Sequence, residues 1–215
     1  MKDIKYAIFD MDGTLLDSMH IWDTASGAFL MMRGIIPKEF DLFRKHGYKG
    51  GIKYMIEEYN LNMTFDEVLE GLQKILWFYY SEIAPAKGGV KDFLHALKSN
   101  GARLSVATAT EKEMAETALE RNGILDCFDV VLSTHNLGTS KFEPLVFDMA
   151  KEAMHAEGDV YVFEDALYAI RTAKNAGYKV VAIEDYSAED DREEIKKLAD
   201  FYAENYDRVR EYFEL

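Results

Sequence analysis

An apolar run that ends in two carboxylates and a glycine constrains this chain more than any other feature: residues 6–14 read YAIFDMDGT. The aromatic and β-branched residues at the start of the run predict a buried strand. Asp10 and Asp12 are two positions apart, so both side chains would face the same side wherever strand geometry persists. Gly13 lets the chain turn sharply. Two carboxylates this close repel each other, and a divalent cation such as Mg²⁺ would neutralise them, although an ordinary acidic turn explains this stretch equally well.

Beyond residue 86 the pattern alternates between helix and strand. The apolar runs predict strands at 104–108, 128–132, 160–163 and 179–183, separated by amphipathic helices and followed by a mostly helical tail from residue 188. This alternation is typical of a parallel sheet with helices on both faces. We therefore expect an α/β, Rossmann-like doubly wound core to which the strand before Asp10 also belongs.

The segment between these strands carries only helical signals. We predict a helix ending near Gly34, a second with Pro37 in its first turn, a third at 52–59, and a fourth opened by the capping box that begins at Thr64. The basic, glycine-rich stretch 44–51 is expected to be a loop between helices, either solvated or in contact with a substrate anion. This gives two predicted domains: a core at 1–15 and 86–215, and an all-helical insert at 16–85.

Charge and cysteine content exclude several classes of protein. The net charge of −14 argues against binding to nucleic acid or to an anionic membrane surface, but a local cation could still attract a phosphorylated small molecule. Cys127 is the single cysteine, so no internal disulfide can form and a reducing compartment is favoured. No stretch approaches the ~20 apolar residues of a membrane span. We expect a cytoplasmic protein.

Further polar residues fall at predicted strand ends, where parallel sheets bind ligands. Thr108 follows the second strand and is available for an anion, whereas Thr110 is expected to cap the following helix. Lys141 precedes a helix, where a cation is unfavourable unless it faces an anion such as a phosphate. Glu164 and Asp165 follow an apolar strand and could either share a metal with Asp10 or cap the next helix.

These elements, in this order, resemble the haloacid dehalogenase superfamily of phosphotransferases, in particular its first subfamily, which inserts a helical cap after the first strand. The residues that carry the resemblance are Asp10-Met11-Asp12-Gly13-Thr14, Thr108, Lys141 and Glu164-Asp165. Four positions depart from the family pattern. Phe142 stands where proline often follows the lysine, Ala109 where asparagine is common, and Ala166 and Ala169 where serine and glycine are usual.

The resemblance implies a Mg²⁺-dependent phosphatase. Asp10 would be the nucleophile that forms an aspartyl-phosphate, and Asp12 the general acid and base. Asp10, the backbone carbonyl of Asp12, and Asp165 would hold Mg²⁺, with Glu164 beside the metal but not bound to it. Thr108 and Lys141 would complete the catalytic set.

The resemblance also implies a substrate class and the residues that bind it. The substrate would be a small phosphorylated metabolite, and the protein a monomer. The expected substrate-binding residues are Thr14, Thr108, Ala109 and Lys141 in the core and Trp22 and Lys49 in the cap.

Other functions within and beyond the family remain open. The dehalogenase branch lacks the second aspartate, which this chain has as Asp12. A sugar phosphomutase like β-phosphoglucomutase shares the architecture but carries a histidine at the position of Trp22, and His20 would lie about 200° away around the helix. A non-catalytic binding module or a phosphoacceptor domain is the alternative from another class.

Overall fold

The computed structural model describes residues 4–215, and the chain forms two compact units. One, the α/β unit, runs to Asp17 and resumes at Pro85–Leu215; the other, the helical unit, is Ser18–Ala84. The backbone N–H of Asp17 donates to the carbonyl of Pro85 at 2.9 Å, so the chain leaves and re-enters the α/β unit at adjacent points. Residues 1–3 of the predicted core lie outside the described residues.

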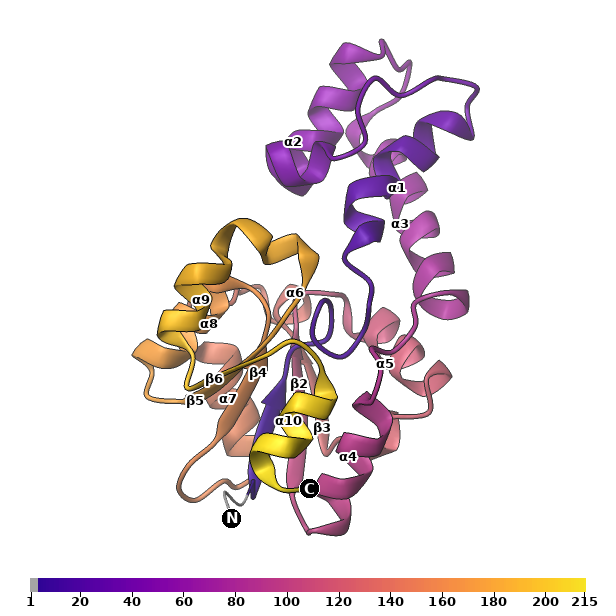
Figure 1. The fold of residues 1–215 in the computed structure, drawn as a ribbon. Helices are drawn as coiled ribbons and strands as arrows, with labels where there is room; N and C mark the ends of the chain where they lie inside the picture. The colour runs from indigo at the N-terminus through magenta and orange to yellow at the C-terminus, as the bar shows by residue number, and fades with distance from the viewer. Residues whose placement is uncertain (1–3) are drawn as a thin grey trace. The chain divides into compact units, whose positions relative to one another are not determined.

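A parallel sheet forms the centre of the α/β unit, with the spatial order β3-β2-β1-β4-β5-β6 (Figure 1). Its strands are β1 (Tyr6–Phe9), β2 (Arg103–Thr108), β3 (Val130–Ser133), β4 (Tyr161–Glu164), β5 (Lys179–Ile183) and β6 (Phe201–Ala203). Every neighbouring pair is parallel. After β3 the chain crosses back and places β4 on the other side of β1, so the winding direction reverses beside β1. The predicted Rossmann-like, doubly wound sheet is confirmed, and a reversal of this kind is where such sheets bind ligands.

Helices lie between the strands of this sheet and after the last one. They are α4 (Val90–Ser99), α5 (Lys112–Arg121), α6 (Thr134–Leu137), α7 (Leu145–Ala153), α8 (Leu167–Asn175), α9 (Arg192–Leu198) and α10 (Tyr206–Phe213), with short 3₁₀ turns at Leu125–Cys127 and Tyr186–Asp191. The tail is mostly helical, as predicted, but the prediction missed β6, because a three-residue strand is too short to show a period of its own. Within residues 4–215, no helix has the length and apolar character that crossing a membrane requires.

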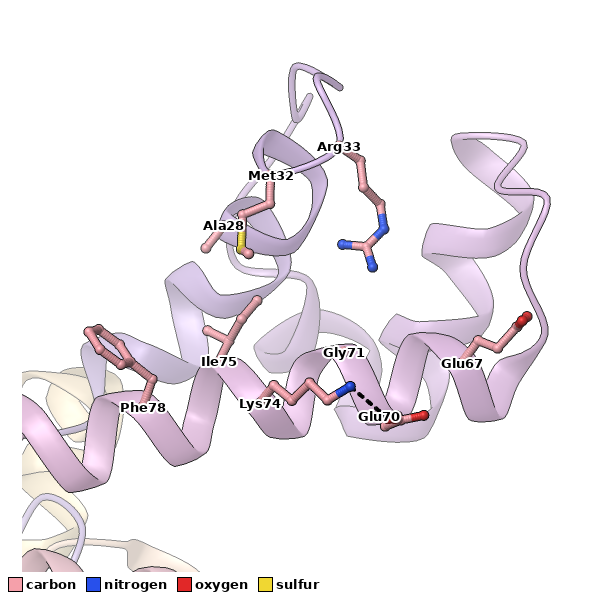
Figure 2. A pocket seen from close by; sticks show the side chains of 9 residues that line it. All are labelled: Ala28, Met32, Arg33, Glu67, Glu70, Gly71, Lys74, Ile75 and Phe78. Carbon is pink, nitrogen blue, oxygen red and sulfur yellow. Dashed lines mark hydrogen bonds and ion pairs between the residues drawn. The ribbon is translucent and has the colours of Figure 1, made fainter.

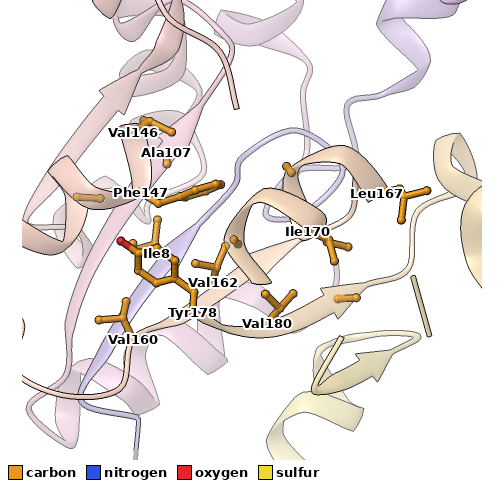
Figure 3. Close-up of a cluster of buried hydrophobic side chains, with 14 of the residues drawn as sticks. Ile8, Ala107, Val146, Phe147, Val160, Val162, Leu167, Ile170, Tyr178 and Val180 are labelled. Carbon is orange, nitrogen blue, oxygen red and sulfur yellow. The ribbon is translucent and has the colours of Figure 1, made fainter. Parts of the chain in front are cut away.

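Both faces of the sheet are buried, which explains why the strand sequences are almost continuously apolar. On one face Ile8, Val162 and Val180 form a row in register across β1, β4 and β5. Phe147 from α7 and Ile170 from α8 pack over this row (Figure 3). On the other face the aromatic rings of β1, β4 and α4 meet: Phe9 and Phe163 stack at 4.4 Å and Phe93 contacts both. The sheet is thereby a rigid base for the loops at its carboxyl edge.

The helical unit consists of α1 (His20–Met31), α2 (Leu42–Glu58) and α3 (Phe65–Glu82). The predicted capping box before α3 is confirmed: the N–H of Thr64 donates to Glu67 at 2.7 Å, and the Thr64 hydroxyl accepts from the N–H of Glu67 at 3.3 Å. The helix expected to begin at Pro37 does not form, because residues 35–41 connect α1 and α2 without helical structure.

The stretch 44–51 is helical and lies within α2, so the predicted loop was wrong. Only Gly47 leaves the helical conformation, with φ 68° and ψ 167°, and it kinks α2. Gly51 has a different role, because a Cβ there would lie 2.6 Å from the ring of Phe43. The glycines therefore serve a kink and a close contact rather than a flexible loop.

A groove of about 700 Å³ lies between α1 and α3 within the helical unit (Figure 2). Its apolar lining includes Met32, Ile75 and Phe78. The charged groups in it have partners nearby: Lys74 donates to Glu70 at 2.7 Å, and the Arg33 guanidinium lies 3.5 Å from the centre of the Phe29 ring. The groove is thus an apolar surface on which Lys74 is paired with Glu70 and Arg33 lies against the Phe29 ring.

Candidate active site

The predicted charged residues of the α/β unit meet at the carboxyl edge of the sheet, beside the reversal between β1 and β4. Asp10 directly follows β1, and its N–H donates to the carbonyl of Phe163 in β4 at 2.9 Å. Glu164 is the last residue of β4, and Asp165 follows it. Lys141 enters from the turn that precedes α7. Three separate segments of the sequence therefore converge on one site.

Lys141 joins β1 and β4 through its ammonium group. Nζ donates to Oδ1 of Asp10 and, at 2.6 Å, to Oε1 of Glu164. Only 3% of Lys141 is exposed, and both partners are buried. Burial acts to lower the pKa of Lys141, but Asp10 and Glu164 outweigh it and hold the pKa above its usual value. Lys141 is therefore a permanent cation that holds Asp10 in place.

Glu164 has hydrogen-bond partners on both of its oxygens. Oε1 accepts from Lys141, and Oε2 accepts from the N–H groups of Asp165 and Ala166, each at 2.9 Å. The alternative in which an acid caps the helix after β4 is wrong, because Ala166 is the N-cap residue of α8 and no side chain caps that helix end. Glu164 thus fixes the lysine and the turn, and Asp10 and Asp165 are the carboxylates available to a further ligand.

The site carries an excess of negative charge. One oxygen from each of Asp10, Glu164 and Asp165 lies within 4.8 Å of the others, and Lys141 supplies a single positive charge against the three. Burial raises the pKa of Asp10 to about 8, with Glu164 and Asp12 adding to the effect and Lys141 opposing it. Burial also raises the pKa of Asp165, followed by the charges of Glu164 and Asp10. A divalent cation on Asp10 and Asp165 would balance this charge, and the oxygen donors suit a hard ion.

A tight turn after β1 orients the next residues. Gly13 has φ 81°, which glycine adopts without strain, and its N–H donates to the carbonyl of Leu16 at 2.9 Å. Thr14 is fully buried, and its hydroxyl contacts Oδ1 of Asp165 at 3.4 Å. The hydroxyl of Tyr206 donates to the carbonyl of Thr14 at 3.3 Å. The predicted substrate-binding Thr14 is therefore buried and contacts the carboxylate of Asp165.

The end of β2 differs from the prediction at Thr110. Thr108 is fully buried, and its hydroxyl oxygen accepts from the N–H of Thr110 at 3.1 Å, while Ala109 between them is exposed. Glu111, not Thr110, is the N-cap residue of α5, and no side chain caps that helix end. The Thr110 hydroxyl instead donates to Oδ2 of Asp12 at 2.7 Å. The signal that could have revealed this is a second hydroxyl residue two positions beyond Thr108.

Phe142 follows Lys141 at the position where the family pattern often has proline, and its side chain connects the loop to helix α8. Its ring stacks on that of Tyr168 in the first turn of α8, with centroids 4.5 Å apart and planes inclined by 27°. Burial raises the pKa of Tyr168, and Glu164 adds to the effect. The stack ties the loop that carries Lys141 to the helix that follows Glu164 and Asp165.

The two remaining predicted residues, Trp22 and Lys49, belong to the helical unit. Neither takes part in the contacts described above for the carboxyl edge of the sheet. Trp22 is in α1, and its ring meets that of Tyr48 edge-on at 5.9 Å. Lys49 is an exposed residue of α2. His20 in α1 lies 3.1 Å from the hydroxyl of Tyr79, so its ring nitrogen is engaged inside the helical unit.

A family model and two similar proteins agree on the family to which this chain is related. A family model described as haloacid dehalogenase-like hydrolase matches residues 7–183. Validoxylamine A 7'-phosphate phosphatase of Streptomyces hygroscopicus subsp. limoneus is 28% identical over 182 residues, which cover 83% of this chain and 85% of that protein. The phosphorylated carbohydrates phosphatase of Thermotoga maritima is 26% identical over 174 residues, 79% of this chain and 80% of that protein.

Solved structures share the fold. The β-phosphoglucomutase of Clostridium difficile superposes with a TM-score of 0.73 over 98% of this chain and 96% of its own, at 20% identity. An identity this low supports the shared fold alone.

Proposed function

We propose that this chain, which belongs to the haloacid dehalogenase-like hydrolase family, is a Mg²⁺-dependent phosphatase that hydrolyses a small phosphorylated metabolite through a phosphorylated Asp10. The observation that carries the proposal is the buried contact of Lys141 with Asp10 and Glu164, beside Asp165. It combines an oriented carboxylate, a fixed cation and a place for a divalent ion. Catalysis of phosphoryl transfer depends mostly on such positioning and charge stabilisation.

In the first step, an oxygen of Asp10 attacks the phosphorus and the bond from phosphorus to the leaving oxygen breaks. Asp12 gives its proton to that oxygen. In the second step, Asp12 takes a proton from water, the water oxygen bonds to phosphorus, and the bond to Asp10 breaks. Lys141 and Thr108 stabilise the phosphoryl oxygens. Bound Mg²⁺ would supply positive charge against the carboxylates and the phosphate.

The substrate class follows from the chemistry of the relatives. Two of them are named for phosphorylated carbohydrates and for the 7'-phosphate of validoxylamine A. We infer a phosphate ester of a polyhydroxylated small molecule. The role of the helical unit as a cap that selects the leaving group through Trp22 and Lys49 remains a prediction.

The direct test is phosphate release from a panel of phosphomonoesters, with Mg²⁺ and with a chelator. Release that requires Mg²⁺ supports the proposal. If no ester releases phosphate while β-glucose 1-phosphate is isomerised, the protein is a mutase. If neither reaction occurs although Mg²⁺ binds, the catalytic proposal is wrong.

Mg²⁺ is expected to stabilise the fold more at pH 8 than at pH 6. The pKa of Asp10 is raised from 3.8 to about 8, so between these values the metal-free folded state binds more protons than the unfolded state, and its stability falls as pH rises. At pH 6 most Asp10 side chains carry a proton, which Mg²⁺ must displace in order to bind. At pH 8 fewer of them carry a proton, so Mg²⁺ meets less competition from protons. At 100 times its Kd, Mg²⁺ should add about 2.7 kcal/mol.

Thermal unfolding with and without Mg²⁺ measures this effect. Asp165→Asn should reduce the stabilisation, and Asp126→Asn, at an exposed position of the same unit, should leave it unchanged. A shift in melting temperature that is equal at both pH values would argue against Asp10 as a ligand.

A further inference from the structure

We infer that Thr110 is a positioning residue that orients the Asp12 carboxylate for proton transfer. This inference rests on the proposed function. Its basis is the hydrogen bond from Oγ1 of Thr110 to Oδ2 of Asp12, 2.7 Å long, between residues 98 positions apart in the sequence. A hydrogen bond from hydroxyl to carboxylate at this distance is of the strong, charge-assisted kind.

Thr110 is itself held firmly. Its N–H donates to the hydroxyl oxygen of Thr108 at the end of β2, and its carbonyl accepts from the hydroxyl of Ser133 at the end of β3, at 3.1 and 2.7 Å. Thr110 is 6% exposed and Ser133 is 2% exposed. The ends of three neighbouring strands are therefore linked through one threonine, which places its hydroxyl independently of any substrate.

The two carboxylates after β1 thus have different partners. Asp10 receives the ammonium of Lys141, and Asp12, which is only half-buried, receives a neutral hydroxyl. Thr110 therefore holds the Asp12 carboxylate without placing a second charge beside it. By holding Oδ2 it fixes the plane of the carboxylate, and hence the direction of Oδ1.

The start of α5 supports a functional reason for this arrangement. Thr110 and Glu113 have the spacing of a capping box, yet helix α5 begins one residue later, with Glu111 at the N-cap and no side-chain cap. A hydroxyl cap would stabilise the helix by about 1 kcal/mol. The local preference gives way to the contact with Asp12, as is common at functional sites.

The test compares phosphate esters whose leaving groups differ in whether they need a proton in order to depart. p-Nitrophenyl phosphate has a leaving group that departs without one, whereas an alkyl phosphate such as a sugar phosphate requires it. The comparison uses kcat/KM, because this constant covers the steps up to departure of the leaving group. In the Mg²⁺-loaded protein, Thr110→Val should lower kcat/KM about 10- to 100-fold for the alkyl ester and less than about 3-fold for the aryl ester. Thr110→Ser, which keeps the hydroxyl, should restore most of the loss.

Thr117→Val is the matched control, since that hydroxyl donates to the carbonyl of Glu113 on the exposed side of the same helix. It should leave both constants unchanged. Equal losses on the two esters, no loss on either, or a Thr110→Ser variant as slow as Thr110→Val would overturn the inference while the phosphatase stands. A wild-type protein that hydrolyses neither ester would overturn the proposed function, and the inference with it.

Discussion

Asp10→Asn is expected to lower kcat by about 10⁴-fold or more for every phosphomonoester that the wild-type protein hydrolyses. The substitution keeps the size of the side chain but removes the carboxylate that we propose as the nucleophile, so the proposed two-step route through a phosphorylated aspartate would be lost. Steady-state phosphate release at saturating ester and Mg²⁺ measures the effect. The fold should survive, because the change removes one of three clustered negative charges while Lys141 keeps Glu164 as a partner.

The control for this prediction is Asp126→Asn, which changes an exposed carboxylate of the α/β unit and should retain wild-type turnover. The metal-free melting temperature of Asp10→Asn should equal or exceed that of the wild type. An Asp10→Asn variant that retains more than about a tenth of the wild-type kcat would rule out Asp10 as the nucleophile.

Lys141→Met is expected to destabilise the protein by about 3–5 kcal/mol and to lower kcat by about 10²- to 10³-fold. The variant leaves Asp10 and Glu164 buried without a counter-charge, which is the costly way to break a buried ion pair. It also removes the cation that we propose to stabilise the phosphoryl oxygens. Burial raises the pKa of Asp10 to about 8, so this carboxyl group can take up a proton at low pH, and the loss of stability should be larger at pH 8 than at pH 5. Urea unfolding at the two pH values measures it.

Two further variants make this prediction specific. Glu164→Gln in the Lys141→Met background removes one unpaired charge and should recover part of the stability. Lys74→Met breaks the exposed pair with Glu70 on α3 and should cost no more than about 0.5 kcal/mol. Similar losses for Lys141→Met and Lys74→Met would mean that the buried contact has no special energetic role.

The parts of the fold that sequence analysis predicted correctly are those with a strong local signal. The predicted strands at 104–108 and 179–183 agree with β2 and β5 to within a residue, because buried parallel strands are apolar throughout. The motif residues Asp10, Lys141 and Glu164 were expected at strand ends or ahead of a helix. They converge because all strands of a parallel sheet end at one edge.

The remainder depends on side-chain contacts that local sequence patterns do not show. The glycines of α2 suggested a loop, and only the ring of Phe43 against Gly51 explains a glycine inside a helix there. Thr110 satisfied the rule for a helix cap, and only the position of Asp12 reveals its other partner. The contact of Phe43 with Gly51 leaves no trace in local periodicity, and the spacing of Thr110 from Thr108 does not by itself identify Asp12 as the partner.

The most direct test of the central claim is to trap the phosphorylated enzyme. Asp12→Asn should still react with p-nitrophenyl phosphate, since that leaving group needs no proton, but should hydrolyse the intermediate slowly because the general base is missing. Acid quenching followed by peptide mass spectrometry should find one phosphoryl group on Asp10, labile to hydroxylamine as an acyl phosphate is. A burst of nitrophenol without a phosphoryl group on Asp10, or with one on another residue, would contradict the account.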